Sequence, residues 1–219
     1  MHDDNPTNLP AEAAAPVPAT TTNQAPAPGS LFATGEAFEH AQRCARLLQA
    51  STLLPPGFKN SLADTVLLIE ISNRLGVSPF VAAQNLTFIH GKPCWSAQFV
   101  IALLNGCGRF SPLKFRMEGE GDGLTCTAYA TELATGEEIE GPPVSVEMAR
   151  REGWFSRAGS KWPTLTRLML TYRAGTFFAR VHAPGLLLGL RTADEVGDIG
   201  ATGQGNQAAA VELLLEADQ

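Results

Sequence analysis

The chain has 219 residues, of which 44% are hydrophobic, and its formal net charge is −6. This length is enough for one domain of about 150 to 170 residues with a real core. A run of about 20 apolar residues, as a membrane-spanning helix needs, is missing, and so is the basic start and apolar run of a signal peptide. We therefore expect a soluble, cytoplasmic protein that has no membrane partner.

Three parts of the chain differ in composition. Residues 1–35 are rich in Ala, Pro and Thr without apolar periodicity, which predicts a disordered N-terminal tail. Residues 36–198 contain the periodic segments and are predicted to form the folded domain. Residues 199–219 form an acidic C-terminal tail, in which residues 208–219 have the pattern of a short amphipathic helix.

Charge is distributed unevenly along the chain. All sixteen Lys and Arg residues lie between residues 41 and 192, where they face eleven acids, and the segments on either side contain acids alone. Residues 150–191 hold eight cations against a single acid, Glu152. A basic body between acidic ends predicts a polyanionic partner.

The first half of the chain is predicted to be mostly helical. Apolar residues at helical spacing predict helices over 36–51, 60–76, 78–85 and 96–108. Asn60 or Ser61 is the expected N-cap of the second, and Gly76 its C-terminal stop. Between the last two, residues 86–95 alternate as in a β-hairpin, with Gly91 supplying the tight turn.

The second half is predicted to begin with a small sheet. The β-favouring segments 110–119, 124–132 and 137–145 are separated by turn residues, so we expect an antiparallel three-stranded meander that the hairpin joins. Helices then follow over 145–153, 165–181 and 191–198. The fold class is α+β, with helices packed around a small antiparallel sheet.

Catalytic signatures are absent from the sequence. It contains no GxSxG, GxxxxGK[ST], HExxH or GxGxxG motif, and its four cysteines show no CxxC spacing, so we expect no cofactor, zinc site or disulfide framework. The acids between residues 118 and 140 fall on predicted turns and strand ends. A solvated surface is one interpretation of these acids, and a metal site is the other.

The predicted helix over 165–181 is apolar on two sides. At 100° per residue, Leu165, Leu168, Met169, Tyr172 and Ala179 share one arc, and Leu170, Phe177, Phe178 and Val181 share another. Arg173 and Arg180 lie within about 20° of each other in the gap between the arcs. Partly buried guanidiniums need an anion, which is either a carboxylate of another segment or the phosphates of a ligand.

Aromatic residues bracket cations in the segment before this helix. Trp154, Phe155 and Trp162 bracket Arg157 and Lys161, and cations for phosphates beside flat rings for bases are typical of a single-strand binding groove. The two tryptophans could instead be core anchors. Lys92 in the hairpin turn, together with Arg109, Lys114 and Arg116, could extend the same basic surface.

The order of these segments resembles the RecT/Redβ superfamily of phage single-strand annealing proteins. The residues that carry the resemblance are "NRLGVSPFVAAQNLTFIHGKPCWSAQFVIALLNGCGRF", a small sheet, "KWPTLTRLMLTYRAGTFFARVHAP" and "TADEVGD". The resemblance implies the fold of that superfamily and an ATP-independent recombinase that coats single-stranded DNA and anneals complementary strands through a duplex intermediate. It also implies a homo-oligomeric ring or filament, a phage exonuclease partner, and the host single-strand-binding protein.

The same resemblance implies where DNA binds. The positions that match the backbone-contacting residues of the superfamily are Lys161, Arg167, Arg173 and Arg180, and Lys92 is a looser match. Two interpretations from other classes stay open at this point. One is a metal-dependent DNA-processing enzyme, such as a nuclease, that uses the acids around residues 118–140. The other is a non-catalytic assembly protein in which the Arg173 and Arg180 pair is internal to the core.

Overall fold

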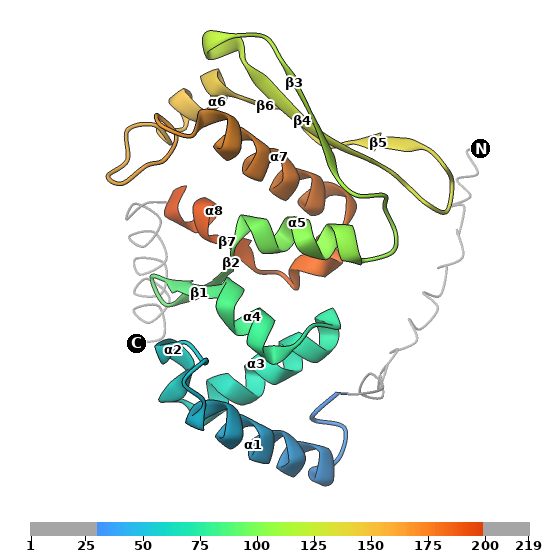
Figure 1. Cartoon of the computed structure of the whole chain (residues 1–219), viewed down its shortest axis with the longest axis vertical. Helices are drawn as coiled ribbons and strands as arrows, with labels where there is room; N and C mark the ends of the chain where they lie inside the picture. The colour runs from blue at the N-terminus through green and yellow to red at the C-terminus, as the bar shows by residue number, and fades with distance from the viewer. Residues whose placement is uncertain (1–29, 199–219) are drawn as a thin grey trace, which may run out of the picture.

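The computed structural model describes residues 30–198. Most of the predicted N-terminal tail and all of the C-terminal tail, including the helix expected at 208–219, lie outside the described residues. The start of the domain differs from the prediction, because Leu31 is buried and its backbone N–H donates to Glu70 Oε2 at 3.0 Å. The α+β class is confirmed, and the mixed arrangement of helices and small sheets is shown in Figure 1.

Four helices form one end of the molecule. They are α1 (Gly35–Ala50), α2 (Pro56–Lys59), α3 (Leu62–Leu75) and α4 (Pro79–Asn85). Ser61 caps α3 by accepting a hydrogen bond from the Asp64 N–H, and Gly76 ends it in the left-handed conformation at φ 66°, as predicted. A small apolar cluster joins α1 to α3 through Leu31, Ala41, Ala45, Val66 and Ile69.

The predicted hairpin forms, but it belongs to a different sheet from the meander. Strands β1 (Leu86–Ile89) and β2 (Lys92–Trp95) pair antiparallel, and the turn places His90 and Gly91 at φ 50° and 73°. A two-residue strand, β7 (Arg191–Thr192), then pairs parallel to β2. The expectation of one joined sheet is therefore wrong. A sequence distance of about 100 residues separates β7 from β2, and short-range patterns do not detect such pairing.

The meander forms a second sheet. Strands β3 (Lys114–Glu118), β4 (Thr125–Thr131) and β5 (Glu138–Glu140) pair antiparallel in that order, and β6 (Val144–Ser145) pairs with the start of β4. The 3-10 turn η1 (Gly121–Gly123) connects β3 to β4. Along β4, Cys126, Ala128 and Ala130 are buried and face the core, while the residues between them lie on the outer face.

The long helix α7 (Thr166–His182) lies under this sheet and packs on α5 (Ala97–Gly106). Small residues permit the close approach, since a Cβ at Gly175 would lie 2.8 Å from Ile101 Cγ1. The two predicted apolar arcs are only partly correct, because Leu165, Leu168 and Val181 are exposed whereas Arg173 and Thr176 are buried. The buried face is centred on Ala174, Gly175 and Phe178. The prediction relied mainly on large apolar residues, so it did not place the small residues Ala174 and Gly175 on this face.

The layers follow one another along the long axis of the molecule. In Figure 1 the second sheet lies at the top, α7 beneath it, then α5 and α8 (Ala193–Asp198), then the hairpin, and α4, α3 and α1 at the bottom. Helix α6 (Val146–Arg151) follows β6, and the 3-10 turn η2 (Pro184–Leu187) follows α7. The Trp95 indole N–H donates to the Leu187 carbonyl at 3.3 Å, which ties the hairpin to η2.

Membrane-spanning potential was assessed for the helices within residues 30–198. None of them alone is long and apolar enough to cross a bilayer. Helices α3 and α4 reach that length and composition only when they are counted together, across a bend of 105°.

Candidate nucleic-acid interface

The loop between α6 and α7, residues 152–165, has a defined shape of its own. The Trp154 N–H donates to the Ala149 carbonyl at 2.9 Å, and the Leu165 N–H donates to the Lys161 carbonyl at 2.8 Å. At its centre, the rings of Trp154 and Trp162 lie 5.1 Å apart, and Phe155 lies 5.6 Å from Trp162. Three aromatic rings from one loop therefore stack into a single cluster, which fixes the loop against the domain.

Both tryptophans are buried in this cluster. Trp154 and Trp162 are 5% and 6% exposed, and both belong to the main hydrophobic core. The sequence suggested them as platforms for bases, with core anchors as the alternative, and in this structure they are core anchors. A base cannot stack on a ring face that other side chains already cover. The third ring, Phe155, was noted as one of the aromatic residues around the cations but was not singled out as a DNA contact, and it is only half-buried.

Arg173 belongs to the same cluster. Its side chain is 5% exposed, and its Cζ lies 4.1 Å above the centroid of a Trp154 ring. A desolvated guanidinium stacked on an indole is a favourable cation–π contact. Arg173 therefore contributes to the fold, and its positive charge lies behind the surface that a ligand would touch.

A small cavity opens on the outer side of Arg173. Its volume is about 220 Å³, and its polar lining comes from Arg157, Ser160, Lys161, Arg173 and Asp194. Three of the predicted DNA contacts, Arg157, Lys161 and Arg173, thus line one site. Asp194, from the first turn of α8, is the only carboxylate in that lining. We call this cavity the cation pocket.

Arg180 is held by α8. Its guanidinium makes two hydrogen bonds to Glu195, from Nε to Oε1 and from Nη2 to Oε2, and the Thr192 N–H and hydroxyl donate to the same Oε2 at 2.8 and 2.9 Å. The sequence left open whether a carboxylate or a ligand phosphate satisfies this arginine. In the structure the carboxylate of Glu195, on α8, binds Arg180.

The ion pair changes the ionisation of both groups. Burial alone would raise the pKa of Glu195, but the bonds from Arg180 and Thr192 outweigh it and hold that pKa below its usual range. The bond from Glu195 raises the pKa of Arg180 further. The pair is therefore fully charged at neutral pH. Sequence analysis missed Glu195, although the acids of "TADEVGD" directly follow a stretch that has none.

The remaining predicted cations lie on the surface. Lys161 and Arg167 are exposed, and within residues 30–198 neither makes an ion pair. Arg167 lies in the first turn of α7, at the start of the helix that carries Arg173. Lys92 is exposed on the hairpin at the start of β2 and does not line the cation pocket. The loop and the start of α7 thus hold the exposed part of the predicted site.

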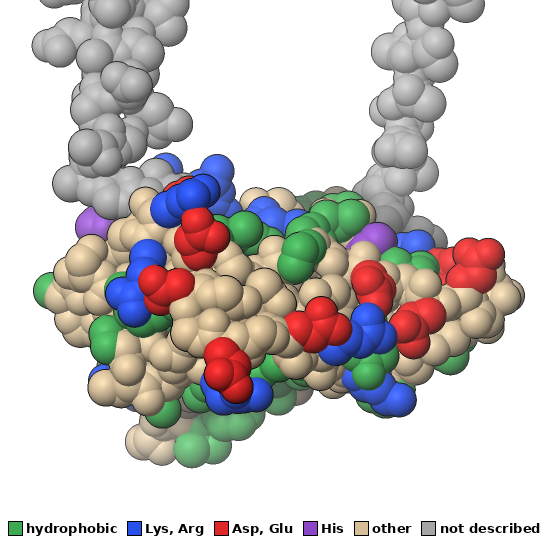
Figure 2. All heavy atoms as spheres, turned by 90° about the horizontal axis from the view of Figure 1, so that it is seen from above, with side chains coloured by type: hydrophobic (Ala, Val, Ile, Leu, Met, Phe, Trp, Pro, Cys, Tyr) green, Lys and Arg blue, Asp and Glu red, His purple; other side chains and the backbone are tan. Residues whose placement is uncertain are grey.

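The outer face of the second sheet does not extend this basic surface. Arg116 bonds to Glu140 and to Glu138 and lies 4.7 Å above the Tyr129 ring, and Arg109 bonds to Glu132 at 2.9 Å. Seen from the end where this sheet lies, Figure 2 shows blue and red side chains next to one another rather than in separate patches. Of the predicted extension, Arg109 and Arg116 are therefore paired with carboxylates of Glu132 and of β5, whereas Lys114 on β3 is exposed and stays a candidate contact.

Four of the seven acids between residues 118 and 140 are engaged by arginines. Besides Glu132, Glu138 and Glu140, Asp122 accepts a hydrogen bond from Arg150 at 2.8 Å. Over residues 30–198, no group of three or more His, Cys, Asp or Glu side chains converges as metal ligands would. The four cysteines are free thiols, and burial raises the pKa of Cys94 and of Cys126.

Comparisons with known proteins give no match: no family model, no curated protein and no solved structure is detectably similar to this chain.

Proposed function

We propose that this protein binds single-stranded DNA along the α6–α7 loop and the start of α7, and that it anneals complementary strands without ATP. One observation carries the proposal. Residues 153–192 contain six cations and no acid, the fold exposes three of them, Lys161, Arg167 and Arg191, and Lys161 lines one pocket together with Arg157 and Arg173. The resemblance to the RecT/Redβ superfamily points to the same residues.

The chemistry of such a surface is simple. Lys and Arg neutralise backbone phosphates and release counterions, so the affinity is independent of sequence and falls steeply with salt. Annealing forms base pairs between strands and needs no covalent step. It needs a surface that holds the sugar-phosphate backbone and leaves base edges accessible to a second strand. Neither a nucleotide nor a metal has a part in that process.

Assembly into a homo-oligomer is part of the proposal. The exposed apolar side chains Leu47, Leu53, Phe80 and Val81 lie on the α1–α4 segment, at the opposite end of the molecule from the second sheet (Figure 1), and Phe88 lies on the hairpin next to it. Apolar side chains exposed together are typical of protein interaction surfaces. A second copy of the chain docked at that end would leave the cation pocket open to DNA. An exonuclease and the single-strand-binding protein of a host are the further partners that we propose.

The deciding experiment follows duplex formation between two complementary oligonucleotides, without ATP or divalent metal, with and without the protein. We expect the protein to accelerate pairing, and a Lys161→Glu, Arg167→Glu variant to lose that acceleration. Both side chains are exposed and neither makes an ion pair within residues 30–198, so circular dichroism and thermal melting should show an unchanged fold. A wild-type protein that neither binds the strands nor accelerates their pairing contradicts the proposal.

A second arm separates annealing from strand processing. Labelled single strands incubated with the protein and Mg²⁺ should keep their full length. Shortened products would show instead a metal-dependent enzyme that acts on DNA.

A further inference from the structure

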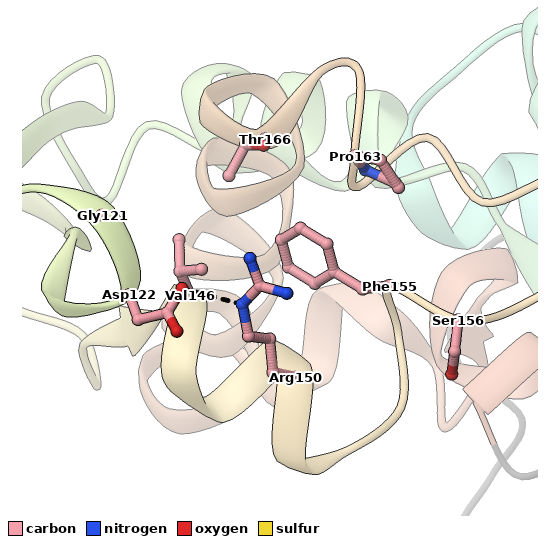
Figure 3. Close-up of a pocket in the computed structure, with 8 residues that line it drawn as sticks. All are labelled: Gly121, Asp122, Val146, Arg150, Phe155, Ser156, Pro163 and Thr166. Carbon is pink, nitrogen blue, oxygen red and sulfur yellow. Dashed lines mark hydrogen bonds and ion pairs between the residues drawn. The ribbon is translucent and has the colours of Figure 1, made fainter.

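A larger cavity lies on the other side of the same loop. Its volume is about 520 Å³, and its lining includes Asp122 of η1, Val146 and Arg150 of α6, Phe155 and Pro163 of the loop, and Thr166 of α7. Figure 3 shows Phe155 and Arg150 reaching toward each other across this space, with Asp122 bonded to Arg150. We call it the aromatic pocket.

The polar groups of this pocket form an exposed, movable pair. Arg150 Nε lies 2.8 Å from Asp122 Oδ1, and the two side chains are 54% and 62% exposed. The Arg150 Cζ also lies 4.5 Å from the centroid of the Phe155 ring. Exposed ion pairs contribute little to stability, so a ligand can rearrange this one at small cost. The pocket then offers the flat ring of Phe155, the N–H donors of the Arg150 guanidinium and the carboxylate of Asp122 as an acceptor.

The two pockets share one wall. Phe155 packs on Trp162, and Trp162 together with Trp154 lines the cation pocket. The loop therefore presents cations on one face and, on the other, the half-buried Phe155 ring, over which the exposed Arg150 guanidinium lies. Arg150 has to move off this ring before a base can stack on it. The contact between Phe155 and Trp162, whose rings lie 5.6 Å apart, links the two pockets through the loop.

We propose that the aromatic pocket holds one unpaired nucleobase of the bound strand, stacked on Phe155 and bonded at its edge by Arg150 and Asp122. This inference rests on the proposed function. The occupant follows from the lining: Phe155, Pro163 and Val146 suit a flat, apolar face, and a donor beside an acceptor suits the edge of a base. A bare phosphate fits poorly, because the Asp122 carboxylate would repel it.

This assignment replaces the tryptophans as the base platform. Trp154 and Trp162 are buried and hold the loop, whereas Phe155 keeps part of its ring accessible. A base held on this ring is removed from stacking with its neighbours in the strand. Its edge must leave Arg150 and Asp122 when the complementary strand pairs with it, so the pocket would order the bases without fixing the strand permanently.

The test compares Phe155→Leu with Phe155→Tyr in the full chain. Leu keeps most of the apolar packing against Trp162 but removes the flat ring, and Tyr keeps the ring. Binding is measured with an ordinary oligonucleotide, with one that carries abasic sites throughout, and with free nucleoside monophosphate. The matched control is Phe32→Leu, an exposed phenylalanine just before α1 that belongs to neither pocket nor to the proposed assembly surface.

Loss of one stacked base lowers affinity on the order of tenfold. We therefore expect Phe155→Leu to weaken binding of the ordinary strand about tenfold, with an unchanged dependence on salt. Phe155→Tyr and Phe32→Leu should bind as the wild type does. The abasic strand should bind the wild type and Phe155→Leu equally.

Three results overturn the inference. If Phe155→Leu binds the ordinary strand as tightly as the wild type does, no base stacks on Phe155, although the protein still binds DNA. An equal loss for the abasic strand assigns Phe155 a structural role. Nucleoside monophosphate that binds as tightly as the strand makes the pocket a small-molecule site. A wild type that binds no strand at all contradicts the proposed function instead, and this inference with it.

Discussion

Two regions of this molecule carry arginines, and they differ in where the compensating carboxylates come from. On the outer face of the second sheet, Arg116 meets Glu138 and Glu140 from β5, two strands away, and Arg109 meets Glu132. In the stretch from residue 153 to residue 192 no acid is present, and the carboxylate that binds Arg180 comes from α8.

The difference shows that a count of cations does not identify a polyanion site. On the sheet, strand pairing places the acids of β5 near Arg116, and Arg109 binds Glu132 just after β4, so both arginines have carboxylate partners. Along the loop and α7 the local sequence provides no acid, so the charge stays positive unless another element covers it. Helix α8 covers Arg180, and Lys161 and Arg167 remain exposed. The following experiments test this contrast, from the largest expected effect to the smallest.

The largest effect is expected on DNA affinity. Reversing two charges in the Lys161→Glu, Arg167→Glu variant removes two phosphate contacts and adds repulsion, which should weaken single-strand binding on the order of 100-fold at low salt. The comparison is Arg109→Ala with Arg116→Ala on the sheet, which should change affinity less than about threefold, as expected for arginines that already have carboxylate partners. Fluorescence anisotropy with a labelled oligonucleotide measures both. If the two variants lost DNA affinity equally, the loop with the start of α7 and the outer face of the sheet would not differ as DNA-binding surfaces.

The second effect is on stability at Arg173. Truncation to Ala removes a buried side chain and its contact with Trp154, and should lower the free energy of unfolding by about 2 to 3 kcal/mol. Lys161→Ala, a cation of the same pocket that is exposed, should change it by less than about 0.5 kcal/mol. Urea unfolding monitored by circular dichroism compares them. If Arg173→Ala were as stable as the wild type, the arginine would not be part of the core.

The third effect depends on pH. Glu195→Gln breaks the ion pair with Arg180, and should cost about 1 to 2 kcal/mol at pH 7 once the 36% exposure of Arg180 is discounted. The folded-state pKa of Glu195 lies below its unfolded value. The stability from the pair is therefore present above the ordinary glutamate pKa of about 4.3, and is lost as pH falls through the lower folded value.

Thermal melting of the wild type and of Glu195→Gln between pH 7 and pH 3 checks this pH dependence. The difference in stability should be constant from pH 7 to about pH 5 and should shrink below about pH 4. A difference that stayed constant down to pH 3 would show that the carboxylate charge has no part in it. Glu147→Gln, which breaks the exposed pair between Glu147 and Arg151, is the matched control.

The smallest effect is expected on the sheet. A double-mutant cycle between Arg116→Ala and Glu140→Ala should give a coupling free energy below about 1 kcal/mol, because both side chains are exposed. If this coupling were larger than that between Arg180 and Glu195, measured in the same way, the exposed ion pair of the sheet would be the stronger one, contrary to this expectation.

Local sequence predicted most of the elements correctly. The cap at Ser61, the left-handed Gly76 and the tight turn at Gly91 were all readable, because each depends on the conformational preference of one or two residues. The meander was readable from its alternation. The prediction assigned the hairpin to the meander sheet. In the structure β2 instead pairs in parallel with β7, a long-range contact that local sequence patterns do not reveal.

The site was predicted less completely than the elements. Sequence placed Arg157, Lys161 and Arg173 on one feature, and they do line one pocket. It could not decide between a base platform and a core anchor for Trp154 and Trp162, since both roles use the same large ring. It also gave no sign that Phe155, between Trp154 and the start of α7, would be the ring left partly open.

By itself the sequence determined the α+β class, the positions of the longer helices and the absence of acids from residues 153–192, since these depend on local preference and on composition. It missed α2 and β7, and the strand predicted over 137–145 is two strands, β5 and β6. Only the tertiary structure decided which cations face solvent. Burial of Arg173 depends on its contact with Trp154, nineteen residues earlier in the chain, and neutralisation of Arg180 depends on Glu195, fifteen residues later. Contacts of that kind are set by how helices and loops pack, and helical periodicity alone does not reveal them.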